Sequence, residues 1–524
     1  MGAYLNSQTP YTLYQSESRS PYFVDKTMLL QELFPYVAAG NRHLCVTRPR
    51  RFGKTIAANM ISSFFQKGID SGELFDRLKI SEADDCQKYK NKYNVIRIDF
   101  SKMPRNCESY RQYIERVEEL LISDLREAYP DAKTSETDAI GDILEEIFQQ
   151  YHGEKFIFVL DEWDFIFHRG FITEADKAKY VAFLSNLLKD RPYVILSYMT
   201  GILPIAKYSS GSELNMFAEF TMVNSPMFGT YFGFTDDEVD DLYERYCREC
   251  EKQRKIKNVT RKGLRDWYNG YYTKSGERGY NPRSVVFALQ FNNLANYWTS
   301  SGPYDEIYYY IRNNVSDVRD DLALMAAGES VSAKIQEYAA TSMNLSTRDE
   351  IYSAMVVYGF LSYLNGKVSI PNRELMEKFD ELLMKNESLG YVYRLAKESE
   401  KMLKATLAGD THTMEKILEL VHDTEVPLLS YNHETELSAI VNLVYLAARD
   451  SYRVEREDKA GVGYVDFIFY PYDLTADGII LELKVDHTPE EAIQQIKDRK
   501  YALKFVPRLA EQKKYTGKIL AVGI

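Results

Sequence analysis

The sequence lacks any apolar run of the ~20 residues that a membrane-spanning helix needs. Its first residues, MGAYLNSQTPYTLYQ, contain no basic segment followed by an apolar one. The five cysteines are scattered, which argues against a disulfide framework and fits a reducing compartment. Cys247 and Cys250 form a lone C-R-E-C without a second pair or a nearby histidine, so we interpret them as helical thiols. We expect a cytoplasmic protein with no membrane partner.

An excess of positive charge is also missing. The net charge of -12 argues against a protein that coats nucleic acid through its overall charge, although a local basic groove stays compatible with it. Repeats and low-complexity tracts are absent as well. With 524 residues, 45% of them apolar, the chain is too long for one ordinary core and predicts about three compact domains.

The first third of the chain alternates short apolar runs with helical patterns. The runs HLCVTR, NVIRIDF, KFIFVLDE and YVILSYMTG are typical of buried strands, and a long helix is predicted from about residue 109 to 127. Buried strands separated by helices predict a parallel sheet with helical crossovers.

The octapeptide RPRRFGKT, residues 48–55, ends like a P-loop but has Arg48 where a glycine is expected. In a P-loop, backbone N–H groups and a helix N-terminus surround the phosphates, the lysine reaches the β and γ groups, and the Ser/Thr hydroxyl holds Mg²⁺. A strand precedes this loop and a helix is predicted to open at Gly53. We expect Arg48 to take a conformation that glycine normally eases. The predicted nucleotide-binding residues of the loop are Arg50, Arg51, Phe52, Gly53, Lys54 and Thr55.

The run KFIFVLDE delivers Asp161 and Glu162 to the end of a buried strand. In a P-loop NTPase the first carboxylate binds Mg²⁺ and the second orients or deprotonates the attacking water. The alternative is a core strand followed by an exposed acidic turn. Thr200, at the end of YVILSYMTG, is a weaker candidate that senses the γ-phosphate, because threonine also forms turns at strand ends. Asp99 and Ser101 lie on the same predicted rim without an assigned role.

From Asp236 to about Met384 the pattern becomes mostly helical. Near its end, IYSAMVVYGFLSYLNGKVSIPN predicts a helix, a strand, an Asn-Gly turn and a strand, which is the outline of a winged-helix module. Such a module binds DNA in some proteins and is a purely structural wall in others. We favour the structural interpretation.

At this point the ordered motifs resemble a known family. The segments YFVDKT, RPRRFGKT, IRIDFS, FVLDEWD, FGFTDDEV, WYNGY and YNPRSV are similar to those of the bacterial AAA-ATPase-like family, whose loop typically reads R-P-R-R-F-G-K-[ST]. The resemblance covers nearly the whole chain. It implies ATP rather than GTP, and a PD-(D/E)XK nuclease-like C-terminus.

The C-terminal segment has the residues that such a nuclease needs. Two carboxylates hold metal at the scissile phosphate, and a lysine positions the water or offsets developing charge. Asp466 lies in GYVDFIFYP, and Glu482 and Lys484 lie two apart in GIILELKV, so the spacing is D-x15-E-x-K. If the two strands pair as a hairpin, the three side chains converge. Val465 stands where the pattern's proline would be.

Further residues fit the same pattern. Glu434, with Glu436 as a close rival, matches the acidic residue that often precedes the first strand, and Gln495, followed by Tyr501, resembles the helix residues of the family. Basic residues after position 497 are interpreted either as a DNA path or as a solvated helix face. They are Arg499, Lys500, Lys504, Arg508, Lys513, Lys514 and Lys518.

The predicted fold is therefore α/β, with four parts. Residues 1–235 form a P-loop AAA-type ATPase domain, 236–385 a helical lid with a winged-helix-like region, 386–425 a helical connector, and 426–524 a restriction-endonuclease-like α/β domain. The leading hypothesis is an ATP- and Mg²⁺-dependent ATPase that controls a Mg²⁺-dependent nuclease acting on DNA. The alternative is a nucleotide-dependent regulatory or interaction protein whose nuclease fold does not cleave. A homo-oligomer is compatible with both.

Overall fold

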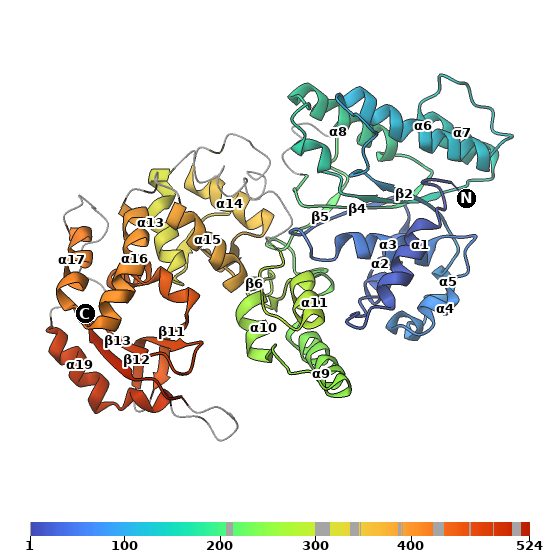
Figure 1. Cartoon of the computed structure of the whole chain (residues 1–524). Coiled ribbons are helices and arrows are strands. Elements are labelled where there is room, and N and C mark those ends of the chain that lie inside the picture. Colours follow the sequence, from blue (N-terminus) through green and yellow to red (C-terminus); the bar gives the residue numbers. More distant parts are fainter. Residues whose placement is uncertain are drawn as a thin grey trace.

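The computed structural model describes most of the chain. The described residues are 2–205, 213–298, 315–335, 345, 347–385, 389, 391–422, 434–460, 463–485, 487–505 and 515–524. Figure 1 shows them as an N-terminal block around one sheet, a central group of helices and a C-terminal block around a second sheet.

A five-stranded parallel sheet forms the N-terminal block, in the order β2-β3-β4-β1-β5. All six residues of the strand that ends in Asp161 are buried, as expected of a strand covered on both faces. The four apolar runs therefore form the strands that the sequence predicts. The strands are β1 (Arg42–Thr47), β2 (Asn94–Asp99), β3 (Phe156–Asp161), β4 (Val194–Gly201) and β5 (Ala218–Phe220).

Helices cover both faces of this sheet. In Figure 1, α1 to α5 lie below the sheet and α6 to α8 above it. The predicted long helix is α6, which begins after Ser109, whose side chain accepts a hydrogen bond from the Gln112 N–H. The helices are α1 (Thr9–Ser18), α2 (Leu29–Ala39), α3 (Lys54–Phe65), α4 (Gly72–Phe75), α5 (Cys86–Tyr89), α6 (Tyr110–Ala128), α7 (Ile140–Gln150) and α8 (Glu174–Leu188).

The next segment is a small helical unit with its own core. It consists of α9 (Asp236–Gln253), α10 (Arg261–Tyr268), the hairpin β6 (Tyr271–Tyr272) and β7 (Arg278–Gly279), and α11 (Pro282–Phe291). Its buried side chains include Val239, Leu242, Tyr246, Leu264 and Val285. We call this unit the lid.

The predicted winged-helix outline follows. Asn365 and Gly366, with φ angles of 49° and 81°, form the tight turn between two short strands. The three strands lie in the order β8-β10-β9. All residues from 351 to 358 of the preceding helix are buried, which favours the structural interpretation over DNA reading by that helix. The elements are α13 (Val315–Ala326), β8 (Val331–Ser332), α14 (Arg348–Tyr358), β9 (Ser362–Leu364), β10 (Lys367–Ser369) and α15 (Arg373–Lys385).

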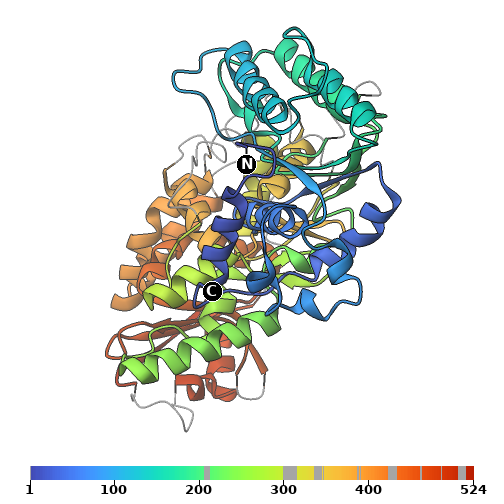
Figure 2. The same ribbon diagram turned by 90° about the vertical axis from the view of Figure 1, so that its right-hand side faces the viewer.

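The C-terminal block is a mixed four-stranded sheet, β11-β12-β13-β14, in which the first three strands are antiparallel and the last pair is parallel. Figure 2 shows this sheet at the end of the molecule away from α6 to α8. No helix among the described residues is long and apolar enough to cross a membrane. The elements are α16 (Tyr391–Ala408), α17 (Thr411–His422), α18 (Glu434–Val444), the short 3-10 helix η7 (Leu446–Asp450), β11 (Tyr452–Ala460), β12 (Gly463–Pro471), β13 (Gly478–Glu482), α19 (Pro489–Asp498) and β14 (Ile519–Gly523).

Candidate active sites

A cavity of about 960 Å³ opens at the carboxyl end of the parallel sheet. The loop between β1 and α3 forms one wall, and its residues 50–55 all line the cavity. Helix α3 begins at Lys54, with Gly53 as its N-cap residue at a φ of 86°. The helix N-terminus, with its unpaired backbone N–H groups, therefore faces the cavity, an arrangement suited to binding phosphate.

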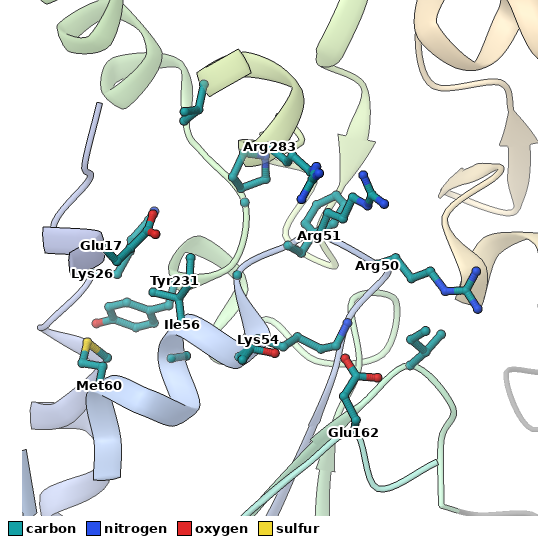
Figure 3. Close-up of a pocket in the computed structure, with 18 of the residues that line it drawn as sticks. Glu17, Lys26, Arg50, Arg51, Lys54, Ile56, Met60, Glu162, Tyr231 and Arg283 are labelled. Carbon is teal, nitrogen blue, oxygen red and sulfur yellow. The ribbon is translucent and has the colours of Figure 1, made fainter. Parts of the chain in front are cut away.

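Lys54 is buried beneath this loop. Its ammonium donates hydrogen bonds to the carbonyls of Arg48 and Pro49, each at 3.0 Å. Figure 3 shows the side chain pointing toward Glu162. Burial lowers the pKa of Lys54, and the carboxylates of Glu162, Asp164 and Asp161 oppose that shift. The lysine thus ties the start of α3 to the start of the loop, and its acidic neighbours favour its charged form.

The backbone conformation expected at Arg48 falls at another residue. Arg48 is not among the residues with positive φ, whereas Arg51 has a φ of 70°. A left-handed conformation costs a non-glycine residue roughly 1–2 kcal/mol. The Arg48 side chain is buried, donates to the carbonyls of Thr47 and Phe220 at 2.8 Å, and lies over the ring of Phe232. Arg48 therefore anchors the loop to β5 and the segment after it.

Asp161, at the end of β3, is fully buried and engaged from three sides. The Thr55 side chain lies close enough to lower its pKa. The Oδ2 of Asp161 lies 2.9 Å from Nη2 of Arg97, and its Oδ1 accepts the N–H of Glu162. Burial raises the pKa of Asp161 to about 6, against the opposing charge of Arg97. The Thr55–Asp161 pair is the arrangement expected of two Mg²⁺ ligands, whereas Arg97 was not assigned from the sequence.

Glu162 follows with a φ of 52°, a left-handed conformation that is uncommon for glutamate. Its side chain lines the cavity, burial raises its pKa, and Lys54 opposes that shift. Thr200 lies beside Asp161 in the register of β3 and β4, and its buried hydroxyl has no hydrogen-bond partner among the described residues. Strain and unpaired buried groups of this kind concentrate at functional sites.

Asp164 has a role that the sequence did not suggest. It is buried and its Oδ2 accepts the N–H groups of Ile202 and Leu203 at 3.0 and 2.8 Å, so it fixes the turn that follows Thr200. A Cβ at Gly201 would lie 2.4 Å from Asp164 Oδ1 and 2.5 Å from Cδ1 of Trp163. This turn therefore has no room for a side chain.

Gly201→Ala is expected to destabilise the N-terminal block by about 1–3 kcal/mol, because overpacking displaces buried neighbours. The measurement is denaturant unfolding followed by tryptophan fluorescence, to which Trp163, buried beside this turn, contributes. Gly170→Ala is the matched control, since an added Cβ there meets nothing within 4 Å. Equal unfolding midpoints for the two variants would contradict the prediction.

The far end of the cavity differs in chemistry from the phosphate end. Figure 3 shows Glu17, Lys26, Met60 and Tyr231 at the side opposite Glu162. Lys26 is paired with Glu238 of the lid at 2.6 Å. Apolar and aromatic side chains next to polar groups are typical of small-molecule sites, and the size of the cavity suits a nucleotide.

A second group of polar residues converges in the C-terminal sheet. Strands β12 and β13 form the antiparallel hairpin that brings Asp466 beside Glu482. Asp466 Oδ2 accepts the N–H of Leu483 at 2.7 Å, and Lys484 Nζ lies 3.8 Å from Glu482 Oε1. Burial and the charge of Asp466 raise the pKa of Glu482 to about 7, with Lys484 opposing them. The structure thus brings Asp466, Glu482 and Lys484 into one site.

The other predicted residues of this site lie outside the β12–β13 hairpin in the sequence. Gln495 is half-buried on α19. Glu434 begins α18, but its side chain, like that of Glu436, lies outside the described part, as do Arg508, Lys513 and Lys514. Tyr501 is buried in one apolar cluster with Val465 and Ile468 of β12 and Ile480 of β13, and burial raises the pKa of its hydroxyl. Within the described residues, no three His, Cys, Asp or Glu side chains form a metal-binding group.

Cation binding at this site is expected to rise with pH. Because the pKa of Glu482 is raised to about 7, its carboxyl stays protonated below that pH and ionises as the pH increases. Mn²⁺ affinity, measured by calorimetry without nucleotide, is expected to be about tenfold weaker at pH 6 than at pH 8. The same titration of Glu482→Gln is the control and is expected to lack this step. An equal affinity at both pH values in the unsubstituted protein would contradict the assignment.

The parallel sheet with its phosphate-type loop and acidic strand end defines a P-loop ATPase domain, joined here to a small mixed-sheet domain. Residues 14–210 match the family model described as a predicted AAA-ATPase, and residues 435–520 match the PD-(D/E)XK nuclease superfamily. The chain therefore carries an AAA-ATPase-like domain at its N-terminus and a PD-(D/E)XK nuclease-superfamily domain at its C-terminus.

Similar proteins add little beyond this. An uncharacterised protein encoded in the vnfD 5′ region of Azotobacter chroococcum mcd 1 is 23% identical over 290 residues, which are 54% of this chain and 51% of that protein. This chain thus spans about half the length of that relative. Among solved structures, a Walker-type ATPase of Pyrococcus abyssi aligns with a TM-score of 0.36 at 11% identity, covering 68% of this chain and 94% of that one. The ORC2 protein of Aeropyrum pernix, in ADPNP-ADP complexes, aligns with 0.34 at 12%, covering 68% and 91%.

Proposed function

We propose that the N-terminal domain binds ATP with Mg²⁺ and hydrolyses it, and that the C-terminal domain cleaves DNA in a metal-dependent reaction. The observation that carries the first part is the cavity lined by Lys54, Thr55 and Glu162, with the Thr55 side chain near the buried carboxylate of Asp161. The residues suit Mg²⁺ and a phosphate: Thr55 is exposed, Asp161 is a buried carboxylate, and Thr200, beside Asp161 in the strand register, has a buried hydroxyl without a hydrogen-bond partner among the described residues.

In this proposal, Lys54 exchanges the carbonyls of Arg48 and Pro49 for phosphate oxygens, and the backbone N–H groups of residues 50–55 bind the same phosphates. Mg²⁺, when bound, neutralises charge that develops on the phosphate oxygens. Thr55 and Asp161 hold it. Glu162 accepts a proton from the attacking water or orients it, and Thr200 contacts the γ-phosphate.

In the C-terminal domain, Asp466 and Glu482 hold the metal, and Lys484 positions the nucleophilic water or offsets charge on the scissile phosphate. Their convergence within one hairpin supports this assignment. Glu434 and Gln495 are proposed to complete the site. Arg499 is exposed and donates a hydrogen bond to the hydroxyl of Tyr501 at 3.2 Å. Its positive charge is proposed to contact the DNA backbone.

The test measures ATP hydrolysis and the nicking of supercoiled DNA with Mg²⁺ or Mn²⁺, with and without ATP. The protein is expected to show both activities, and Lys54→Ala is expected to lose nucleotide binding. Absence of cleavage under every condition, with ATP turnover preserved, would instead favour a nucleotide-dependent regulatory or interaction protein with a non-cleaving nuclease fold. Absence of ATP binding would contradict the proposal as a whole.

A further inference from the structure

Residues at the variable positions of the phosphate loop contact the lid and the winged-helix module. A Cβ at Gly359, which ends α14, would lie 2.7 Å from the ring of Pro49. Phe52 is buried and packs edge-on against Tyr271 of β6, with ring centroids 4.9 Å apart. Arg51 donates to the carbonyl of Tyr297 at 3.3 Å. Three residues of the loop thus meet three different downstream segments.

Glu374, in the first turn of α15, joins these contacts. Its side chain is only 1% exposed. One of its carboxylate oxygens accepts the backbone N–H groups of Tyr297 and Trp298, each at 2.6 Å. The hydroxyl of Ser284, from the first turn of α11, donates to both oxygens at 2.9 Å. Glu374, far downstream of the loop in the sequence, therefore joins the first turn of α11 to the segment of Tyr297 and Trp298.

The loop and Glu374 are also linked by charge. Burial raises the pKa of Glu374 to about 7, and the positive charge of Arg51 acts in the opposite direction. The peptide group between Tyr297 and Trp298 connects the two directly, since its Trp298 N–H donates to Glu374 and its Tyr297 carbonyl accepts from Arg51. Arg51 is the residue held at a φ of 70°, so these contacts offset a conformation that arginine does not favour.

Helix α15 also contacts the C-terminal domain. The guanidinium of Arg373, next to Glu374, lies 4.6 Å from the ring centre of Trp267 in the lid and 5.6 Å from that of Tyr472, directly after β12. Two turns further on, Asp380 pairs with Arg449 of η7 at 2.5 Å. Figure 1 shows α15 between the N-terminal block and the C-terminal sheet.

We propose that Glu374 is a positioning residue for the phosphate loop, acting through Arg51, and that α15 transmits nucleotide binding from this loop to strand β12. The proposal rests on the proposed ATP site. When phosphate binds the loop, Arg51 and the Tyr297 peptide move or stiffen with it, and Glu374 carries that change into α15. Arg373 then alters the end of the strand that holds Asp466.

The first experiment is a double-variant cycle on the binding of the ATP analogue ADPNP with Mg²⁺ to the full chain. Glu374→Gln keeps the shape but places an amide against the N–H donors, and it is expected to raise Kd about tenfold, as is Arg51→Ala. The double variant is expected to resemble the single variants, because both act through one contact. Glu381→Gln, at a partly exposed position of the same helix, is the control with unchanged Kd.

Additive effects of Glu374→Gln and Arg51→Ala would overturn the positioning role. A normal Kd in Glu374→Gln would do the same. Thermal unfolding of each variant identifies a general loss of structure. If Glu374→Gln shows such a loss, Glu374→Asp, which retains the charge, replaces it. Glu374→Asp is then expected to show the same lack of additivity with Arg51→Ala. A failure of the unsubstituted protein to bind ADPNP would instead contradict the proposed function.

The second experiment follows hydrogen exchange in residues 463–471 on addition of ADPNP and Mg²⁺, a readout that needs no nuclease activity. A change in exchange is expected in the unsubstituted protein and in Arg394→Ala, an exposed arginine of α16 used as control. It is expected to be lost in Arg373→Ala while the Kd for ADPNP stays unchanged. Persistence of the change in Arg373→Ala, or its absence from unsubstituted protein that binds ADPNP, would overturn the proposed link.

Discussion

Glu162→Gln is expected to lower the rate of ATP hydrolysis by about 10²–10⁴-fold, the usual contribution of a general base. The amide keeps the size of the side chain at the cavity wall but cannot accept a proton from water. Nucleotide binding is expected to persist, because Lys54, Thr55 and the loop amides are unchanged. Phosphate release under saturating ATP measures the first effect, and titration with fluorescent ADPNP measures the second.

Glu174→Gln is the matched control for this experiment. Glu174 is an exposed residue at the start of α8, paired with Lys177, and lies outside the cavity. Its replacement is expected to leave turnover unchanged. Normal turnover in Glu162→Gln would remove Glu162 from the reaction and reassign the acidic turn after β3 to a purely structural role, the alternative that the sequence left open.

Asp466→Ala is expected to reduce DNA cleavage by about 10³-fold or more. A metal-binding carboxylate supports several kcal/mol of charge stabilisation, and each ~1.4 kcal/mol corresponds to a factor of ten in rate. The substitution also removes the acceptor for the Leu483 N–H, so Asp466→Asn, which retains a carbonyl oxygen there, is the variant that separates chemistry from local structure. Both are expected to bind ATP normally.

The measurement is the nicking of supercoiled DNA over time with Mg²⁺ and with Mn²⁺. Asp498→Ala, an exposed carboxylate of α19 whose side chain contacts Gln494, is the control and is expected to cleave normally. Persistent cutting by both Asp466 variants would contradict the assignment of the site. Loss of cutting in Asp466→Ala alone, with Asp466→Asn fully active, would assign Asp466 to the structure of the hairpin.

Local patterns were sufficient for much of the fold. The four apolar runs became β1 to β4 because a strand buried on both faces must be almost entirely apolar, and this requirement is visible in the sequence itself. The helix that begins at Lys54 was likewise predicted, from its glycine, whereas the hairpin of β12 and β13 was the condition under which the C-terminal side chains would converge. Side chains two residues apart on one strand share a face, which is why Glu482 and Lys484 were expected together.

Such local patterns could not predict contacts between segments that lie far apart in the sequence. Arg97 was visible only as part of a strand, although it is the buried partner of Asp161, because strand order in a sheet decides which side chains become neighbours. Asp164 was visible only as the last residue of the segment FVLDEWD, because its role depends on the turn after β4.

The sequence by itself determined the chemistry available to this protein: a glycine, a lysine and a threonine at a helix start, two carboxylates at a strand end, and a carboxylate pair with a lysine near the C-terminus. Only the tertiary structure decided why the variable positions of the phosphate loop hold proline, arginine and phenylalanine. Those side chains pack against Gly359, Tyr271 and the Tyr297 peptide held by Glu374. Local spacing fixes what a loop can bind, whereas long-range packing fixes what the loop is attached to.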